Sequence, residues 1–460
     1  MRAISLQTLA EQMGGTLLRG SGITSRIHTD TRTIRAGDCF VALSGERFDG
    51  HQYVAASAQA GASAAVVSKI PEGEFPESFG LILVEDTLRA LQRFAHLYRK
   101  SLSVKVVGIT GSSGKTSTKE FIKAVLSEKF KTTATVGNLN NHIGVPLTLL
   151  SLEPETEWAV VEMGMNHPGE IEPLASMSES DYGVITRIGQ SHLENFKNIQ
   201  GIAQEKSELL RSLKSTGKAF IPAEDCFCSY LSGRTEAAKI YVGNSSLSQW
   251  KGTAIQVTAQ GLEFNLEHQG NSVFVRLPLW NRVMIQNALL AAAVGFEAGI
   301  DLEQIAKGLQ KVELPGQRMK IHRNEGALWI NDSYNANPES MEAAIDTLME
   351  IPFEGVRVAV LGSMGELGVN AEMLHREVGS YAARRGVNRV VAVGPMAGSI
   401  AEGVRHITDS KTEVVTTADA ESSIEILKHL DKNQAVLVKG SRFMKLEKVV
   451  EHFTGEGGGH

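Results

Sequence analysis

The sequence is poor in cysteine, with only three among its 460 residues. Cys226 and Cys228 form a single C-x-C pair and Cys39 stands alone, which excludes a disulfide framework and leaves any zinc site without its second half. We expect these cysteines to be free thiols, buried or partly buried, in a reducing compartment. The opening residues, MRAISLQTLAEQMGG, have no continuous apolar stretch of the kind found in signal peptides, so we expect a cytoplasmic protein.

Long apolar runs and a strong excess of one charge are missing as well. No stretch approaches the roughly 20 apolar residues of a spanning helix, so we expect no membrane insertion. Lys and Arg number 46 against 52 Asp and Glu, a formal net charge of -6. That mild acidic balance argues against a nucleic-acid partner. Hydrophobic residues at 42% and charged residues at 21% exclude bulk disorder and fibrous chains.

The chain is long enough for about three domains. Strands alternate with helices from residue 103 onward, which predicts α/β domains with mainly parallel sheets. Short alternating runs between residues 243 and 279 predict a small β-rich addition to the second domain. We expect domains at residues 1–102, 103–313 and 314–454, followed by a disordered tail at 455–460. Helices are expected at 55–65, 88–98, 117–129, 287–298 and 372–384.

The strongest local motif is a glycine-rich loop between a predicted strand and a predicted helix. It reads Gly108-Ile109-Thr110-Gly111-Ser112-Ser113-Gly114-Lys115-Thr116. Glycines let backbone N–H groups converge on phosphate oxygens, and the following helix adds its positive end. Lys115 can reach the terminal phosphates and the Thr116 hydroxyl can ligate Mg²⁺. The motif therefore predicts a nucleotide-binding loop, although Ile109 stands where the strict pattern has glycine.

Three further residues are candidates because of where they lie. Glu162 ends the apolar strand that begins at Trp158, and ligands of α/β sheets gather beyond strand ends. An acid there, beside a phosphate loop, is a candidate Mg²⁺ ligand. His192 follows the next strand, and a lone histidine is more often structural. By itself, Lys206 has the pattern of an exposed helix lysine.

These motifs resemble the Mur ligase family, ATP-dependent amide-forming enzymes of peptidoglycan precursor synthesis, along nearly the whole chain. The resemblance implies a UDP-binding N-terminal domain, a central P-loop ATPase-like domain and a Rossmann-like C-terminal domain. The first 102 residues match the UDP-binding domain at Thr29, Asp30, Thr31, Arg32 and Gly45. The stretch from Asn138 to Pro146 resembles the family's substrate-side loop, with Asn138, Asn140 and Asn141 as candidate contacts.

The most discriminating stretch is Tyr334-Asn335-Ala336-Asn337-Pro338. It resembles the branch of the family that adds D-alanyl-D-alanine to UDP-N-acetylmuramoyl-tripeptide, and Leu361–Gly368 and Val438–Arg442 agree with that branch. The resemblance implies these two substrates, an acyl-phosphate intermediate and a monomer. It makes Asn335, Asn337, Lys439 and Ser441 candidate substrate contacts.

The resemblance also implies roles around the nucleotide. Lys206 matches a lysine that reacts with CO₂ to form a carbamate and helps to place a second Mg²⁺, while Glu162 and His192 match other metal-site residues. Arg318 matches a group that reaches the γ-phosphate of ATP, and Asp332 matches a ribose contact. Asn287 fits the adenine pocket, whereas Val283 and Met284 stand where the family often carries a His-Asn pair.

Two alternatives stay open at this point. The first is another Mur-type or folylpolyglutamate-type amide ligase, against which Asn335 to Pro338 and Thr29 to Arg32 count. The second is a P-loop regulatory ATPase that binds a partner, which would have no need of a nucleotide-sugar domain.

Overall fold

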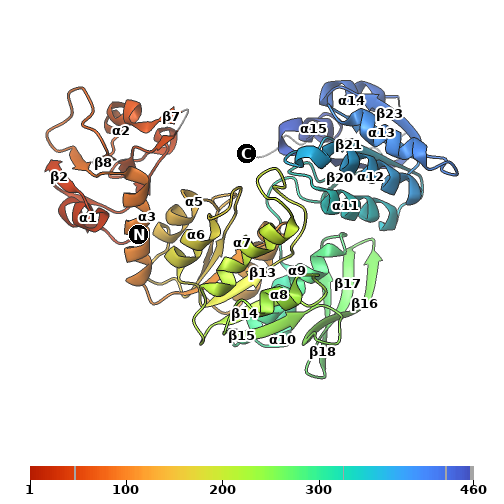
Figure 1. The fold of residues 1–460 in the computed structure, drawn as a ribbon, viewed down its shortest axis with the longest axis horizontal. Helices are drawn as coiled ribbons and strands as arrows, with labels where there is room; N and C mark the ends of the chain where they lie inside the picture. The colour runs from red at the N-terminus through yellow and green to blue at the C-terminus, as the bar shows by residue number, and fades with distance from the viewer. Residues whose placement is uncertain (46–47, 325, 430–432, 456–460) are drawn as a thin grey trace.

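The computed structural model describes residues 1–45, 48–324, 326–429 and 433–455. Three large sheets, each with its own helices, lie along the chain beside two two-stranded ones, and Figure 1 shows three lobes from the N-terminal (red) to the C-terminal (blue) end. Apart from Gly455, the expected tail lies outside the described residues. In the described part, no helix has the length and apolar character needed to cross a membrane.

The N-terminal lobe is built on a five-stranded sheet in the order β2-β9-β8-β5-β4. Its strands are β2 (Thr16–Arg19), β4 (Ile27–His28), β5 (Cys39–Val41), β8 (Ala64–Val67) and β9 (Gly80–Leu83). Its helices are α1 (Leu6–Met13), α2 (Val54–Gln59) and α3 (Thr87–Lys100). The helix expected at 55–65 is too long, because the chain turns at Gly61, whose φ of +95° is left-handed, before entering β8.

The central lobe holds a nine-stranded sheet in the order β11-β12-β10-β13-β14-β15-β16-β17-β18. Its parallel strands are β10 (Lys105–Thr110), β11 (Thr132–Ala134), β12 (Trp158–Glu162), β13 (Tyr182–Ile185), β14 (Lys218–Pro222) and β15 (Ala238–Val242). Helices α4 (Lys115–Leu126), α5 (Gly144–Leu150), α6 (Ile171–Ser178), α7 (Ile199–Arg211), α8 (Cys228–Ser232), α9 (Val283–Glu297) and α10 (Leu302–Gln310) accompany them. Strand β10 lies between β12 and β13, so the loop that follows it is flanked by the carboxyl ends of both neighbours and is not at a sheet edge.

The expected β-rich addition is a continuation of this sheet. Strands β16 (Trp250–Thr258), β17 (Gly261–His268) and β18 (Asn271–Leu277) form an antiparallel meander. It joins the parallel part where Trp250 pairs with Val242 of β15. One sheet therefore spans the whole central lobe.

The C-terminal lobe has a six-stranded sheet in the order β19-β20-β24-β21-β22-β23. Its strands are β19 (Lys320–Asn324), β20 (Ala327–Asn331), β21 (Val356–Gly362), β22 (Arg389–Val393), β23 (Glu413–Thr417) and β24 (Gln434–Lys439). Only the hairpin of β19 and β20 is antiparallel among these pairs. Helices α11 (Pro338–Glu350), α12 (Ala371–Arg384), α13 (Ala397–His406), α14 (Ala420–Leu427) and α15 (Glu447–Thr454) complete the predicted Rossmann-like, doubly wound architecture.

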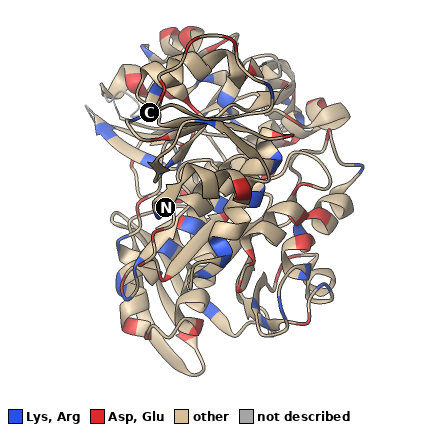
Figure 2. Cartoon of the chain, turned by 90° about the vertical axis from the view of Figure 1, so that its left-hand side faces the viewer, with Lys and Arg blue, Asp and Glu red and all other residues tan. Residues whose placement is uncertain are grey.

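The cysteines and the charges are distributed over these lobes. Cys39 and Cys228 are buried free thiols, as expected, but Cys226 is exposed, so the expectation of burial was wrong for it. Cys226 lies in the turn before α8, where the chain runs along the surface. Figure 2 shows basic and acidic residues interspersed along the chain, not separated by sign.

Candidate active site

A cavity of about 540 Å³ lies where the central and C-terminal lobes meet. Residues that follow β10, β12 and β13 line one side, and residues that follow β20 and end β24 line the other. Carboxyl ends of parallel strands are where α/β sheets bind ligands, and here two sheets share one cavity. The lining residues include Ser112–Ser117, Asn138, Asn140, Asn141, Glu162, Arg187, His192, Asn287, Arg318, Asp332, Tyr334–Asn337, Glu339 and Lys439.

Backbone geometry explains the glycines of the phosphate loop. Gly114 caps α4 with a left-handed φ of +81°, and a Cβ there would lie 3.1 Å from Asn287 Oδ1. A Cβ on Gly111 would come within 1.9 Å of Thr186 Oγ1, so no side chain fits. Helix α4 begins at Lys115, which leaves the N–H groups of its first turn facing the cavity.

The same loop is held in place by side chains of its neighbours. Ser112 Oγ donates to Gly189 O and accepts from Gly189 N, both at 2.9 Å. Thr186 Oγ1 donates to Ser113 O at 2.6 Å. Gly108 and Thr110 lie in β10 beneath the loop and do not line the cavity. The loop is therefore preorganised by the protein alone.

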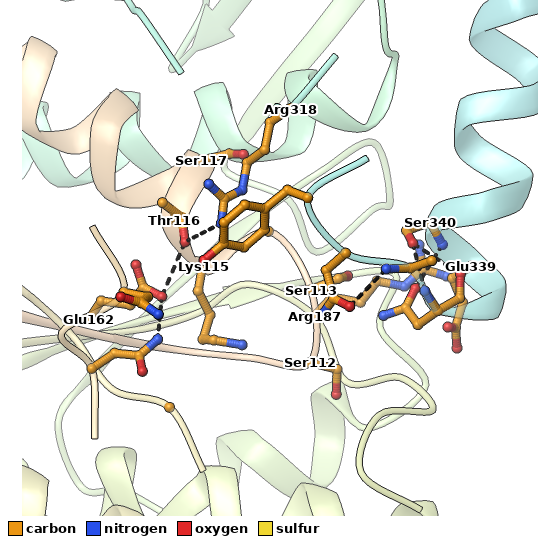
Figure 3. Close-up of a pocket in the computed structure, with 18 of the residues that line it drawn as sticks. Ser112, Ser113, Lys115, Thr116, Ser117, Glu162, Arg187, Arg318, Glu339 and Ser340 are labelled. Atoms are coloured by element: carbon orange, nitrogen blue, oxygen red, sulfur yellow. Dashed lines mark hydrogen bonds between the residues drawn. The ribbon is translucent and has the colours of Figure 1, made fainter. Parts of the chain in front are cut away.

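Glu162 lies next to this loop with one oxygen free. Its side chain is buried, with Oε1 accepting hydrogen bonds from Thr116 Oγ1 at 3.2 Å and Asn140 Nδ2 at 2.8 Å (Figure 3). Its other oxygen, Oε2, has no hydrogen-bond partner among the described residues. Lys119 Nζ, itself fully buried, is 4.0 Å from Oε2. A buried carboxylate oxygen without a partner is costly, and a cation in the cavity would satisfy it.

A half-buried lysine, Lys115, and a fully buried one, Lys206, belong to the same region. Lys115 Nζ donates to Gly111 O at 2.8 Å, and burial lowers its pKa, an effect that Glu162 partly opposes. Lys206, in α7, is 1% exposed, so the pattern of a plain exposed lysine was misleading. Burial and the nearby charge of Lys115 lower the pKa of Lys206 well below its usual range. Its neighbour Glu205 is engaged elsewhere, accepting the N–H groups of Gly169 and Ile171.

Arg318 of the C-terminal lobe extends its guanidinium group towards the central lobe. Its Nη2 donates to Thr116 Oγ1 at 3.4 Å, and its Nη1 donates to Pro315 O at 3.1 Å. The guanidinium lies over the Tyr334 ring, 3.7 Å from the ring centroid, in cation–π geometry. Figure 3 shows Arg318 directed at Thr116, above Lys115.

The remaining C-terminal candidates make hydrogen bonds within their own lobe. Lys439 Nζ pairs with Asp332 Oδ2 at 2.6 Å and donates to Asn335 O at 2.9 Å. Asp332 Oδ1 accepts Met319 N at 3.1 Å. These contacts fix the loop that follows β20 against the segment just before β19, which carries Arg318 and Met319.

Asn337 and Ser441 are also tied into the scaffold. Asn337 is the N-cap of α11, with Oδ1 accepting Ser340 N at 2.9 Å in a capping box. Ser441 Oγ donates to Ala336 O at 3.3 Å and accepts Gly365 N at 2.9 Å. The helix cap engages the side-chain carbonyl of Asn337 and leaves its amide free.

The asparagines of the central lobe differ in their contacts. Asn138 and Asn140 line the cavity, and Asn140 is bound to Glu162. Asn141 Oδ1 accepts Gly144 N at 2.9 Å, at the start of α5. Asn287 is 2% exposed, and its Nδ2 lies 3.5 Å from Met284 Sδ, so the Val283–Met284 departure gives this wall an apolar surface.

The residues expected to bind the nucleotide sugar lie apart from this cavity. Asp30 forms an ion pair with Arg32 at 2.6 Å, and 86% of the Arg32 side chain is exposed. Thr29, Thr31 and Gly45 belong to the same lobe and do not line the cavity. That lobe is attached to the central one through α3, where Tyr98 Oη donates to Leu152 O at 2.7 Å.

Three residues around the cavity were missed in the sequence. Tyr334 supports Arg318, as described above. Glu339 Oε1 accepts Gln190 N at 3.0 Å across the two lobes, and its Oε2 has no partner in the described chain. Glu366 Oε2 lies 2.6 Å from His192 Nδ1, also across the lobes. The strand-end rule that located Glu162 would have found Glu366, which follows β21.

Comparison with known proteins gives consistent matches along the chain. Residues 24–99 match the model described as Mur ligase family, catalytic domain; residues 109–295 match the Mur ligase middle domain; and residues 317–442 match the Mur ligase, glutamate ligase domain. UDP-N-acetylmuramoyl-tripeptide–D-alanyl-D-alanine ligase of Escherichia coli (strain K12) is 38% identical over 456 residues, covering 98% of each chain.

Solved structures are similar over the same extent. A crystal structure of MurF from Acinetobacter baumannii matches with a TM-score of 0.91 and 32% identity, covering 99% of this chain and 100% of that one. MurF ligase from Thermotoga maritima in complex with ADP matches with a TM-score of 0.82 and 27% identity, covering 94% and 97%.

Proposed function

This chain belongs to the Mur ligase family, and we propose that it joins D-alanyl-D-alanine to UDP-N-acetylmuramoyl-tripeptide in an ATP-dependent reaction. The observation that carries the proposal is the shared cavity. The phosphate loop of one lobe and Arg318 of another meet at the Thr116 hydroxyl. The similarity to ligases with that activity extends over nearly the entire chain and supplies the substrates.

The chemistry divides into two steps. A carboxylate oxygen of the tripeptide first attacks the γ-phosphorus of ATP; an O–P bond forms, the bond to the β–γ bridging oxygen breaks, and ADP leaves. The amine of D-alanyl-D-alanine then attacks the acyl carbon, and inorganic phosphate leaves as the C–N bond forms. The amine loses a proton, so the products are the lengthened peptide, ADP and phosphate.

Charge is the main obstacle in the first step, because a triphosphate and a carboxylate must approach each other. Lys115 and Arg318 approach the Thr116 region from the two lobes and would offset that repulsion. The loop that carries Lys115 is preorganised by its hydrogen bonds to Gly189 and Thr186, and Arg318 is held by Pro315 and Tyr334, so little reorganisation is needed during the reaction. Arg318 belongs to the C-terminal lobe, so catalysis requires the two lobes to stay together.

A Mg²⁺ ion fits the residues present. Glu162 Oε2 is buried and accepts no hydrogen bond from the described residues, and the Thr116 hydroxyl lies beside the same carboxyl group. We assign Thr116 and Glu162 to a first Mg²⁺, and His192 with Lys206 to a second. Bound Mg²⁺ would supply further neutralisation of phosphate charge.

We further propose that Lys206 carries a carbamate. Its lowered pKa favours the neutral amine, whose nitrogen can attack CO₂ with loss of one proton. The product has two oxygens that share one negative charge and suit a hard cation, and it replaces the repulsion from Lys115 by attraction. Activity that falls after CO₂ removal and returns with bicarbonate would support this assignment.

The other substrate contacts remain proposals. Asp332 is proposed for the ATP ribose, and Asn287 for the adenine. Asn335, Asn337, Lys439 and Ser441 are assigned to the region that accepts the dipeptide or holds its walls. The nucleotide sugar is assigned to Thr29–Arg32 and Gly45, and the cytoplasm remains the predicted location.

The test is phosphate release in a mixture of ATP, UDP-N-acetylmuramoyl-tripeptide and D-alanyl-D-alanine, with each component omitted in turn. We expect release only when all three are present, with the lengthened peptide detected by mass spectrometry. Release without the tripeptide would favour a regulatory ATPase, and release with glutamate in place of the dipeptide would favour another amide ligase.

A further inference from the structure

Lys119, in α4, is fully buried and has no part in the site as described so far. Lysine side chains are almost never fully buried unless their charge is paired, so the surroundings of this one are informative. Lys119 lies one helical turn after Lys115, but it does not line the cavity. Its ammonium group therefore lies in the interior of the central lobe, behind the wall that Lys115 and Thr116 form.

Three oxygen atoms lie around the Lys119 ammonium group. Nζ donates to Thr135 O at 2.7 Å and pairs with Glu120 Oε1 at 3.0 Å. Glu162 Oε2 is 4.0 Å away, which is too far for a hydrogen bond. Thr135 and Glu120 thus provide the hydrogen-bond acceptors of this ammonium group, whereas Glu162 interacts with it through charge alone.

Thr135 connects Lys119 to the position of Glu162. It is 2% exposed, it follows β11 directly, and its Oγ1 accepts Glu162 N at 3.0 Å. The loop that begins at Thr135 also carries Asn140, whose Nδ2 donates to Glu162 Oε1 at 2.8 Å. By holding the Thr135 carbonyl, Lys119 supports the segment that fixes both the backbone and the carboxylate of Glu162.

Positive charge faces the Glu162 carboxylate from two sides. Lys119 lies behind it, and Lys115 lies on the cavity side, where Glu162 partly opposes the lowering of the Lys115 pKa. Within a protein, two unit charges 4.0 Å apart interact several times more strongly than in bulk water. Lys119 therefore compensates part of the Glu162 charge, and the same positive charge repels any divalent cation that binds to Oε2.

We propose that Lys119 is a positioning residue of the nucleotide site, which holds Glu162 in place and makes divalent-cation binding to Glu162 depend on the nucleotide. A bare cation meets the repulsion of Lys119, whereas a triphosphate brings negative charge that offsets it. Mg²⁺ is usually held by one or two carboxylates together with substrate phosphates, which suits such a dependence. The inference rests on the proposed nucleotide and Mg²⁺ site.

A purely structural role for Lys119 predicts different behaviour. If Lys119 only anchored the segment at Thr135, loss of either of its charged contacts would loosen Glu162 and weaken cation binding. The electrostatic role predicts effects of opposite sign. Removing the charge of Lys119 strengthens the binding of a bare cation, and removing the charge of Glu120 weakens it, because Lys119 then has no other carboxylate to pair with.

Mn²⁺ binding followed by electron paramagnetic resonance tests the proposal, since Mn²⁺ takes the same kinds of oxygen ligand as Mg²⁺. Wild type should bind Mn²⁺ weakly alone and more tightly with a non-hydrolysable ATP analogue. Lys119→Met should raise the affinity for Mn²⁺ alone about 10-fold, the size of effect that a nearby charge has on a proton equilibrium. The gain from the nucleotide should shrink, and Glu120→Gln should lower the affinity for Mn²⁺ alone.

Lys123→Met is the matched control, because Lys123 is an exposed lysine of the same helix, and it should change neither affinity. In a Glu162→Gln background, Lys119→Met and Glu120→Gln should both be without effect, since Lys119 acts through that carboxylate. This background also distinguishes the ion at Glu162 from an ion bound elsewhere. Thermal unfolding checks the fold. If Lys119→Met does not fold, Glu120→Gln decides, because Glu120 is 17% exposed and is more easily replaced.

Several results would overturn the role of Lys119. They are an unchanged or lower affinity of Lys119→Met for Mn²⁺ alone, effects of the same sign in Lys119→Met and Glu120→Gln, or effects that persist in the Glu162→Gln background. Equal Mn²⁺ affinity of wild type with and without the nucleotide would also overturn it. If wild type does not bind the ATP analogue, the proposed nucleotide site itself fails, which is a separate outcome.

Discussion

The two walls of the cavity differ in how their charged side chains are paired. On the central side, Lys206 is buried and Lys115 is half-buried, both with lowered pKa values, and Glu162 Oε2 accepts no hydrogen bond in the described chain, with Lys119 Nζ 4.0 Å away. On the C-terminal side, Lys439 is equally buried but forms a 2.6 Å ion pair with Asp332. The central wall is therefore electrostatically incomplete, whereas the C-terminal wall is complete by itself.

The difference indicates what each wall is for. Unpaired buried charge lowers the stability of the free protein, and such residues gather at functional sites, where a bound ligand can compensate the charge. The paired charges of the C-terminal wall hold its loops in place, and Arg318 extends from that wall into the cavity. Substitutions on the central wall should thus remove activity and spare the fold, and those on the C-terminal wall should cost stability.

The largest expected effect is that of Lys115→Ala, which should lower kcat about 1,000-fold by removing charge stabilisation at the transferred phosphoryl group. The fold should be unharmed. The lowered pKa means that the folded state binds this proton more weakly than the unfolded state, so its contribution to stability rises with pH up to the ordinary lysine value. Removing the charge should therefore not lower Tm at neutral pH.

Steady-state assays and thermal unfolding test this, with Lys123→Ala as the control. Lys123 is an exposed lysine of the same helix, α4. Near-normal turnover in Lys115→Ala would contradict the nucleotide assignment.

Lys439→Met should have the next largest effect, this time on stability. It leaves the Asp332 carboxylate, whose side chain is 13% exposed, without its cation, and breaking a buried pair costs about 3 kcal/mol. The free energy of unfolding from urea titration measures it. Adding Asp332→Asn to the same chain should recover part of the loss, because no uncompensated charge is left. An unchanged free energy of unfolding would show that the C-terminal wall does not depend on this pair.

Lys206→Ala should lower activity about 100-fold if its carbamate oxygens hold a metal ion. Acetate should restore part of the activity by placing a carboxylate in the vacated space, and it should do nothing for Lys115→Ala. Full activity in CO₂-free buffer would contradict the carbamate. Thermal stability should hold or rise, since the substitution removes a buried amine with a lowered pKa.

The smallest effect is expected at the asparagines that follow β20. Asn337→Ala removes the cap of α11 and should cost about 1 kcal/mol of stability. Replacing Asn335 and Asn337 together should raise the dipeptide KM more than the ATP KM, because we assign their loop to the region that accepts the dipeptide. Equal changes in both KM values would limit the two asparagines to a structural role.

Local patterns were enough to predict much of this molecule. The phosphate loop, Glu162 and the parallel sheets follow from motifs within a few dozen residues, where strand, turn and helix periods are directly visible. Boundaries were less accurate: α2 ends at Gln59 because of a turn at Gly61, and α4 begins at Lys115, inside the expected loop. For the residues assigned by resemblance, the sequence could not distinguish those that contact a ligand from those that only make hydrogen bonds within the protein.

The sequence by itself determined the α/β alternation, the glycine-rich loop between β10 and α4 and the family, because each is set by residue types at fixed local spacing. Tertiary structure decided which charges are paired. Lys206 has the pattern of an ordinary helix lysine and Lys439 was predicted to contact substrate, yet the first is buried beside another lysine and the second pairs with Asp332, 107 residues away. Folding brings such distant residues together, and their distances and burial set their pKa values and free hydrogen-bonding atoms. The exposure of Glu366 and the helix-capping role of Asn337 likewise follow from the tertiary structure.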